Sequence, residues 1–312
     1  MVLTGYRQEY EGQVLELWNR VLWTDPINIG KFRKQALFDE NFDPVLCSIV
    51  LDDDRVAGFI LATRRKFPYM ERGLEPDRSW INVLFVDDPF QRKGAGTQLL
   101  LDAEKKLAEL GAKHIIFGAY SPNYFFPGLD CEHYPGAKAF FEKHGYNSGK
   151  IAYSMKKDLH GFRLSEEALA KKAEAEKKGY RFINFEYRYA LDLLEFAKTQ
   201  FGGGWKRNVL ISMQNNLAED CILLALNKAG AIAGFCMRMI DGNPMRFGPI
   251  GVAESERNAS LGGILFDFQQ AEMTKRGFYQ LFFLSTDEPG RRFYERHGVT
   301  VFRIFTEYRK DL

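Results

Sequence analysis

The sequence predicts an α/β fold that occurs twice along the chain. Three observations support this prediction: a glycine-containing loop between a strand-like run and an amphipathic helix, a second segment of similar pattern, and the same order of elements around both. At 312 residues the chain is long enough for two domains of ordinary size. Hydrophobic residues at 46% and charged residues at 27% are typical of a globular protein rather than a disordered or fibrous one.

Charge and cysteine content argue against several classes of function. Lysine and arginine number 43 and aspartate and glutamate 41, so the net charge of +2 indicates neither nucleic acid nor a membrane surface as partner. No apolar run is long enough to cross a bilayer, and the N-terminal residues lack the apolar core of a signal peptide. The four cysteines are widely spaced without a Cys-x-x-Cys pair, which predicts a reduced, cytoplasmic protein without a metal site.

The most informative segment follows the strand-like run Trp80–Val86 and leads through residues 91–97, QRKGAGT, into an amphipathic helix. A glycine-bearing loop that opens a helix leaves backbone N–H groups unpaired, and the helix dipole adds a positive field, so the segment predicts a pyrophosphate site. It lacks the third glycine of a dinucleotide fingerprint, because position 99 is Leu99. The alternative is a plain strand-to-helix turn whose glycines serve packing.

A weak internal repeat places a second such loop in the C-terminal half. When Val252 is aligned with Val86 without a gap, Ser260 falls on Gly94 and Gly262 on Gly96. Each loop is preceded by a hairpin-like pair and followed by a helix, a strand and a second helix. The predicted segments are 47–51, 56–62, 114–119 and 140–145 in the first copy, and 222–226, 232–239, 279–284 and 293–298 in the second.

A segment rich in Ala, Glu and Lys, Ser165–Lys178, lies between the copies and ends at Gly179. We expect an exposed connecting helix that begins near Ser165, with acidic residues in its first turn and basic residues in its last. The predicted organisation is therefore an N-terminal domain at residues 1–160, a connecting helix at 161–179 and a C-terminal domain at 180–312.

The spacing Gln-x-x-Gly-x-Gly at 91–96 resembles motif A of the GNAT acetyltransferases, and the two copies together resemble a tandem GNAT protein over essentially the whole chain. The resemblance implies two GNAT-like domains, each a mixed, mostly antiparallel sheet flanked by helices, whose loops hold the pyrophosphate of acetyl-CoA. The implied cofactor-binding residues are Val86, Gln91, Arg92, Lys93, Gly94, Ala95, Gly96 and Thr97, with Val252, Arg257, Ser260, Gly262 and Gly263 in the second copy.

Acetyl transfer to an amine needs a proton acceptor for the ammonium and a proton donor for the leaving thiolate. In similar GNAT enzymes the donor is often a tyrosine within Phe-Tyr-x-x-x-Gly-Phe, and Tyr294 occupies that place in the second copy. Phe141 occupies it in the first copy and cannot donate a proton. Asp287, seven residues before Tyr294, is the candidate base, although it could equally be a helix N-cap. Tyr294 could also be only a core aromatic residue.

The loops differ in the opposite sense, because Ser260 replaces the first glycine, Gly94. If that position requires a left-handed backbone, a non-glycine residue costs roughly 1–2 kcal/mol. The first copy also has a long aromatic loop at 123–135, whose side chains Asp130, Glu132 and Tyr134 are candidate substrate contacts. The alternative is an ordered cover over the sheet.

Together with the resemblance, these observations predict a cytoplasmic acyltransferase that moves an acetyl group from acetyl-CoA to a primary amine of a small molecule. The resemblance implies direct attack by the amine in a ternary complex. Amino sugars are among the acceptors considered. One alternative is a catalytically degenerate CoA-binding or scaffolding protein, and another is catalysis in the N-terminal copy. The sequence leaves open the acceptor, the acyl-chain preference, the number of CoA molecules bound and the oligomeric state.

Overall fold

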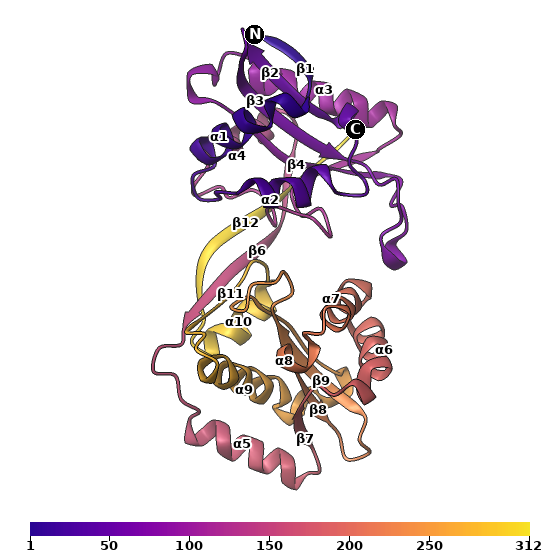
Figure 1. Cartoon of the computed structure of the whole chain (residues 1–312), viewed down its shortest axis with the longest axis vertical. Helices are drawn as coiled ribbons and strands as arrows, with labels where there is room; N and C mark the ends of the chain where they lie inside the picture. Colours follow the sequence, from indigo (N-terminus) through magenta and orange to yellow (C-terminus); the bar gives the residue numbers. More distant parts are fainter. The chain divides into compact units, whose positions relative to one another are not determined.

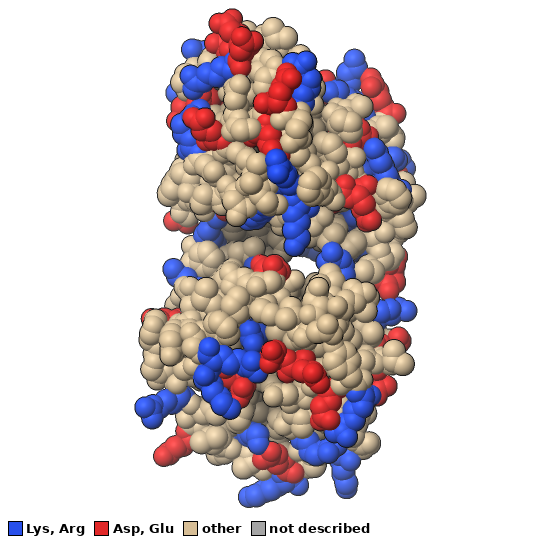
Figure 2. Space-filling view, viewed as in Figure 1, with Lys and Arg blue, Asp and Glu red and all other residues tan. Residues whose placement is uncertain are grey.

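The structure is a computed structural model that describes residues 1–312, except for the side chain of Asn258. The chain forms two compact units (Figure 1). The N-terminal unit consists of Met1–Ala152 together with Arg303–Leu312, and the C-terminal unit of Tyr153–Phe302. Within the described part, no helix has the length and apolar character needed to span a membrane. On the face shown in Figure 2, basic and acidic side chains are interspersed, in line with the small net charge.

The N-terminal unit is built around a mixed sheet in which only β4 and β5 run parallel. The strand order is β1-β2-β3-β4-β5-β12, and the hydrogen-bonded order continues through β6 to β11. The elements of this unit are β1 (Val2–Gly5), α1 (Glu11–Val21), α2 (Ile29–Phe32), β2 (Cys47–Asp52), β3 (Arg55–Thr63), β4 (Arg78–Val86), α3 (Ala95–Glu109), β5 (His114–Phe117) and α4 (Pro135–Lys143), with parts of β6 (Asn147–Asp158) and β12 (Thr300–Asp311).

Helices cover both faces of this sheet because each presents apolar residues at helical spacing. On α3, the side chains of Leu99, Leu100, Ala103 and Leu107 are buried against one face. On α1, Val14, Leu17 and Trp18 are buried in a separate cluster against the other. The sheet is therefore sandwiched, and its strand ends and loops remain available for a site.

The C-terminal unit repeats this plan. Its four-stranded antiparallel sheet has the order β10-β9-β8-β7, with α9 on one face and α6 and α7 on the other. The elements are α5 (Glu166–Lys177), β7 (Arg181–Asn184), α6 (Ala190–Phe201), α7 (Gly203–Gln214), α8 (Ala218–Cys221), β8 (Ile222–Leu226), β9 (Ile232–Arg238), β10 (Phe247–Val252), α9 (Leu261–Lys275), β11 (Gln280–Phe283) and α10 (Glu288–Arg296). The predicted fold class, two α/β copies with mixed, mostly antiparallel sheets, is confirmed.

Close packing confirms the alignment of the two loops. A Cβ atom added at Gly96 would lie 3.4 Å from the ring of Phe140 and 3.6 Å from Val86. A Cβ atom added at Gly262 would lie 3.7 Å from both Phe293 and Val252, the residues aligned with those two. The second glycine of each loop thus lets the start of the helix approach the preceding strand and the following helix.

The predicted domain limits are corrected by the strand pairing. The expected C-terminal domain at 180–312 loses its last ten residues, because β12 pairs with β5 of the N-terminal unit through Tyr308–Asp311. In turn, β6 pairs with β11 through Met155–Asp158, so the C-terminal unit begins at Tyr153 rather than at 180. Strand β12 follows α10 of the C-terminal unit but completes the N-terminal unit, and β6 follows α4 of the N-terminal unit but completes the C-terminal unit. Periodicity identifies a strand but not its hydrogen-bonding partner, which is why the exchange was not predicted.

The connecting helix exists as expected but is not a free linker. The Ser165 hydroxyl accepts the Ala168 amide at 3.1 Å, which confirms Ser165 as the N-cap of α5. However, Ala168 and Ala175 are buried, and Ala175 belongs to the same core cluster as Met273 of α9. The segment 161–179 therefore belongs to the C-terminal unit.

Candidate active sites

In the N-terminal unit, two neighbouring strands separate part of the way along their length. Strand β4 pairs with β5 only from Arg78 to Ile81, whereas it continues along β3 as far as Val86. The register with β3 shifts opposite Ile81 and Val83, which leaves Asn82 as the extra residue of a β-bulge. Beyond Ile81, the edge of β4 that faces away from β3 has no strand partner. We call this region the N-terminal fork.

The open edge of β4 carries backbone groups that can bind a ligand. The Asp87 amide donates to the Ala57 carbonyl on β3 at 2.9 Å. Successive residues of an antiparallel strand direct their polar groups to opposite sides, so Leu84 and Val86 direct theirs to the open edge. There the Gln91 side chain donates to the Val86 carbonyl at 3.1 Å. Gln91 thereby holds the loop against the fork.

The loop after β4 forms the predicted array of amides. Gly94, the N-cap of α3, has a left-handed backbone with φ 94° and ψ −13°. The first intrahelical bond runs from the Gln98 amide to the Gly94 carbonyl at 2.9 Å. The amides of Ala95, Gly96 and Thr97 precede it and find no backbone acceptor in the described part of the chain. They form a donor set at the positive end of a helix, and the neighbouring Arg92 and Lys93 are exposed.

The C-terminal loop has the same left-handed N-cap, but with serine in place of glycine. Ser260 is the N-cap of α9 and is left-handed, with φ 59° and ψ 13°. The predicted cost of roughly 1–2 kcal/mol depends on a left-handed backbone at this position. Ser260 has that backbone. Arg257 does not reproduce the contact of Gln91, because its exposed guanidinium lies 3.9 Å from Glu254. Gly263 brings α9 close to His297, whose ring would lie 3.2 Å from an added Cβ atom.

The C-terminal unit also has a fork, in which fewer residues of the two strands are paired than in the N-terminal fork. A single parallel bridge, Arg246 with Phe282, joins β10 to β11. The Ala253 amide donates to the Ala233 carbonyl of β9 at 2.8 Å, as Asp87 does to Ala57. By the same alternation, Ile250 and Val252 direct their amides to the open edge. We call this region the C-terminal fork.

Tyr294 lies where β10 and β11 separate. Its ring centroid is 4.4 Å from that of Phe283 on β11 and 6.2 Å from that of Phe247 on β10. Burial raises the pKa of the Tyr294 hydroxyl, and the Cys236 and Asp287 side chains add to the effect. The hydroxyl therefore stays protonated at neutral pH, as a proton donor must.

Asp287 is the N-cap of α10, since one carboxylate oxygen accepts the Gly290 amide at 2.9 Å. The capping role considered from the sequence is therefore real. The side chain is exposed, and its charge is close enough to raise the pKa of Tyr294. Capping occupies one oxygen and leaves the other able to accept a proton.

Phe141 occupies the corresponding place in the N-terminal unit. Its ring centroid lies 4.7 Å from that of Phe117 at the end of β5, as the Tyr294 ring lies on Phe283 at the end of β11. The aromatic packing is thus the same in both units, and only the hydroxyl differs.

The model of the acetyltransferase (GNAT) family matches residues 13–125 of the N-terminal unit. The family match therefore concerns the N-terminal unit. Solved structures extend the likeness to the whole chain. A GCN5-related N-acetyltransferase from Sphaerobacter thermophilus is 16% identical, with a TM-score of 0.70, over 99% of this chain and 95% of its own. A tandem GNAT protein from the clavulanic acid biosynthesis pathway is 15% identical, with a TM-score of 0.65, over 99% and 98%.

A third similar structure is larger than this chain. It contains a GCN5-related glucosamine N-acetyltransferase region within a fungal multi-domain GH3 β-N-acetylglucosaminidase, and is 18% identical with a TM-score of 0.81. The match covers 99% of this chain but only 38% of the fungal protein. At such identities the likeness concerns the GNAT fold. No curated protein matches the sequence significantly.

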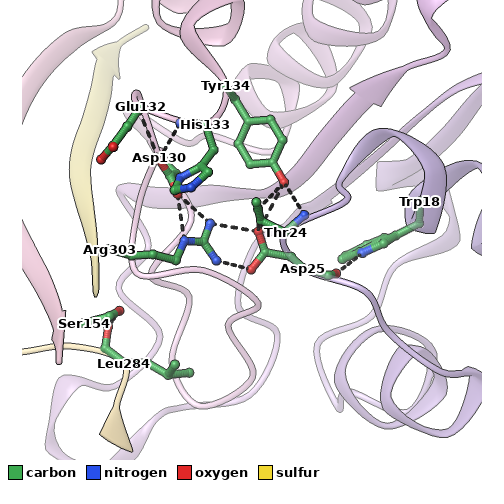
Figure 3. A network of polar contacts seen from close by, with 10 residues as sticks. All are labelled: Trp18, Thr24, Asp25, Asp130, Glu132, His133, Tyr134, Ser154, Leu284 and Arg303. Carbon is green, nitrogen blue, oxygen red and sulfur yellow. Dashed lines mark hydrogen bonds and ion pairs between the residues drawn. The ribbon is translucent and has the colours of Figure 1, made fainter. Parts of the chain in front are cut away.

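The substrate contacts expected in the aromatic loop are largely engaged in contacts within the N-terminal unit (Figure 3). Asp130 is buried and accepts the Arg303 Nε at 2.7 Å and the His133 amide at 3.0 Å. Arg303 also donates to both oxygens of Asp25, at 2.5 and 2.9 Å. We call Arg303, Asp25 and Asp130 the arginine clamp. Burial alone would raise the pKa of Asp130, but the bonds from His133 and Arg303 outweigh burial and lower it.

Tyr134 and Glu132 flank this clamp. The Tyr134 hydroxyl contacts the Thr24 hydroxyl and lies 3.4 Å from Asp25, and burial raises its pKa. Glu132 contributes its amide to Asp130 at 3.2 Å, while its side chain points away from the clamp (Figure 3). Their roles as substrate contacts stay predictions. Arg303 and Asp25 are not among the predicted site residues, and no local pattern joins them, because they are 278 residues apart.

In the described side chains, no group of three or more His, Cys, Asp or Glu residues is arranged to hold a metal ion.

Proposed function

We propose that this chain is an acetyl-CoA-dependent N-acetyltransferase that acetylates a primary amine of a small molecule by direct attack in a ternary complex. The observation that carries the proposal is the same arrangement in both units: a fork between two strands, followed by a left-handed residue and the unpaired amides of a helix start. The amides supply a site for the pyrophosphate of acetyl-CoA. The open strand edge supplies backbone groups for its pantetheine arm.

The proposed cofactor contacts are backbone groups for the most part. In the N-terminal unit they are the amides of Ala95, Gly96 and Thr97, next to Gln91, Arg92, Lys93, Gly94 and the Val86 edge. In the C-terminal unit they are the amides around Ser260, Gly262 and Gly263, next to Arg257 and the Val252 edge. A serine amide donates to phosphate as well as a glycine amide does, so Ser260 weakens the site without removing it.

We place catalysis in the C-terminal unit. An alkylammonium with a pKa near ~10.4 is mostly charged at neutral pH, so the attack needs a proton acceptor. Asp287 would accept that proton directly or through a water molecule. A backbone amide on the open edge of β10 would polarise the thioester carbonyl. Tyr294, buried and protonated, would then donate its proton to the leaving thiolate of CoA.

We propose an amino sugar as the acceptor and the cytoplasm as the location. Support for the acceptor comes from the fungal structure with the highest TM-score among those described, a glucosamine N-acetyltransferase region. Exposed acidic groups such as Asp287 suit an ammonium group on the acceptor.

Release of the CoA thiol from acetyl-CoA, measured over a panel of amines that includes glucosamine, tests the proposal. Ser260→Trp should abolish turnover by blocking the C-terminal loop, whereas the matched change Gly94→Trp should spare it. The opposite result would move catalysis to the N-terminal unit. Absence of acetyl-CoA binding to the wild-type protein by isothermal titration would refute the function altogether.

A second candidate is a CoA-binding protein without transferase activity. It is motivated by the complementary losses, Phe141 in one unit and Ser260 in the other. Tight acetyl-CoA binding together with no thiol release across the whole amine panel would favour it.

A further inference from the structure

A buried arginine without a counter-charge lies at the C-terminal fork. Arg246 is 6% exposed, and its Nε and Nη1 atoms are buried without a hydrogen-bond partner among the described residues. Its guanidinium carbon lies 5.8 Å from the ring centroid of Phe282. A buried charge is ordinarily paired, because desolvation without compensation is strongly unfavourable. Arg246 therefore lacks the partners that a buried guanidinium ordinarily has.

A buried arginine of the N-terminal unit, Arg65, has a counter-charge, although its Nη1 also lacks a hydrogen-bond partner among the described residues. Arg65 is similarly buried, but its Nε pairs with Glu75 at 3.0 Å and its Nη2 donates to the Ser121 carbonyl at 2.8 Å. It also lies 4.8 Å from the centroid of Trp80, the residue that the alignment of the two copies places opposite Arg246. Arg65 therefore differs from Arg246 in having a carboxylate partner.

Arg246 is positioned on the face of the fork opposite Tyr294. Phe247 lies in the same core cluster as Tyr294, and successive strand residues point to opposite faces. Arg246 and Phe282 form the single bridge between β10 and β11, so they share the other face. Lys156 of β6 pairs with Phe282 and lies on that face too. Arg246 has no ion pair within the described part of the chain, and the Lys156 ammonium lies 5.5 Å from the ring centroid of Phe302.

We propose that Arg246, assisted by Lys156, binds an oxyanion on this face, and that the anion is a phosphate or carboxylate group carried by the amine acceptor. A guanidinium binds such groups through two parallel N–H donors, which Nε and Nη1 can supply. The thioester and the acceptor would then meet in the fork from opposite faces. The identification of the anion with the acceptor rests on the proposed acetyl transfer, whereas anion binding does not.

Thermal unfolding with inorganic phosphate and with succinate as probes tests the site without turnover. In anion-free buffer Arg246→Met should unfold at a higher temperature than the wild type, because an unpaired buried charge is removed. Phosphate or succinate should raise the unfolding temperature of the wild type in a saturable way, and the rise should be clearly smaller in Arg246→Met, where only the amides at the two helix starts remain to bind anions. Arg276→Met is the matched control, since Arg276 is already paired with Asp220 at 2.9 Å, and it should keep the anion response.

A lower unfolding temperature of Arg246→Met in anion-free buffer, or an anion response equal to that of the wild type, would overturn the site. Lys156→Met provides a second measurement in which folding is not at risk, because Lys156 is exposed. It should weaken anion binding several-fold by isothermal titration. Unchanged binding would remove Lys156 from the proposal.

Acceptor kinetics separate the two sources of the anion. Glucosamine 6-phosphate and glucosamine form one pair of acceptors, and glutamate and n-butylamine the other. If the natural acceptor carries a phosphate, glucosamine 6-phosphate should have a lower KM than glucosamine. If it carries a carboxylate, glutamate should have a lower KM than n-butylamine. In either case Arg246→Met should raise the KM of the anionic amine roughly 10- to 100-fold, the effect of one charge-assisted contact. Equal KM values within both pairs would refute the acceptor assignment. Thiol release absent from every amine would refute the acetyl transfer, while the thermal measurement would still decide the anion site.

Discussion

The two units share one fold but differ at two positions of the proposed cofactor and catalytic sites. Gly94 and Ser260 both adopt a left-handed backbone before a helix, and Phe141 and Tyr294 both pack on the last residue of a strand. Folding requires the turn and the aromatic ring, and both units retain them. In the proposed function the glycine serves cofactor binding and the hydroxyl serves proton donation, and each unit lacks one of them. The demands of the fold and of the reaction are therefore separable in this chain.

Two aspartates at corresponding places, Asp130 and Asp287, also have the same backbone setting but different surroundings. Asp130 and Asp287 each follow a residue that is joined by two backbone hydrogen bonds to the strand alongside, and each accepts the amide three residues later. The bonded pairs are Leu129 with Thr306, at 2.8 Å in both directions, and Thr286 with Tyr153, at 3.0 and 2.9 Å. Arg303 neutralises Asp130, whereas Asp287 is exposed. The same position thus serves structure in one unit and is open to chemistry in the other.

The largest effect is expected from deletion of residues 303–312. The deletion removes β12 from the N-terminal unit, including the buried Phe305 and Tyr308, each worth about 2–3 kcal/mol, and the clamp arginine. The N-terminal unit should lose its cooperative unfolding transition, as measured by urea unfolding and hydrogen exchange. Tyr308→Phe, which removes only the 3.1 Å bond to Glu142, is the control and should cost about 1 kcal/mol. A truncated chain with both transitions intact would contradict the strand exchange.

A smaller loss is expected from Arg303→Met. Asp130 and Asp25 would be left without their cation, and breaking a buried pair costs about 3–5 kcal/mol. Urea unfolding of the N-terminal unit measures this loss. Arg309→Met serves as control, because Arg309 pairs with the exposed Asp311 and should change stability by less than ~1 kcal/mol. Equal effects of the two substitutions would show that the clamp contributes little.

Substitutions at Tyr294 and Phe141 test which unit is catalytic. Tyr294→Phe should lower kcat by about 100-fold or more, the usual effect of losing a general acid, without loss of stability. Phe141→Tyr should leave turnover unchanged if the N-terminal unit is not catalytic. Steady-state kinetics with the best acceptor measure both. Unaltered kcat in Tyr294→Phe would exclude this tyrosine as the proton donor.

Exchange of the loop residues should give a smaller and opposite pair of effects. Ser260→Gly relieves a left-handed serine and should stabilise the C-terminal unit by roughly 1 kcal/mol, while Gly94→Ser should destabilise the N-terminal unit by a similar amount. An added Cβ atom at Gly94 meets no atom within 4 Å, so the change is one of backbone conformation alone. Acetyl-CoA affinity by titration should move in the same directions by up to ~10-fold. Effects of the same sign in both loops would contradict the shared geometry.

The smallest effect concerns pH. The pKa of Asp130 is lowered in the folded state, so its stabilising contribution is present above the unfolded value near ~3.9 and is lost as pH falls through the folded value. The N-terminal unit should therefore lose stability below about pH 4, and Asp130→Asn should show a shallower loss. Urea unfolding between pH 3 and 7 measures the two slopes. Identical slopes would mean that Asp130 does not contribute to acid unfolding.

The sequence by itself determined the local features: the helix start after Gly94, the repeated order of elements, the N-cap at Ser165 and the alignment of Phe141 with Tyr294. Each depends on residues a few positions apart, where spacing and conformational preference act directly. The tertiary structure alone decided the exchange of β6 and β12, the clamp that Arg303 forms with Asp25 and Asp130, and the unpaired Arg246. These depend on hydrogen bonds and burial between segments that are distant in the sequence, and the energy of a buried charge is set by neighbours that no local pattern identifies.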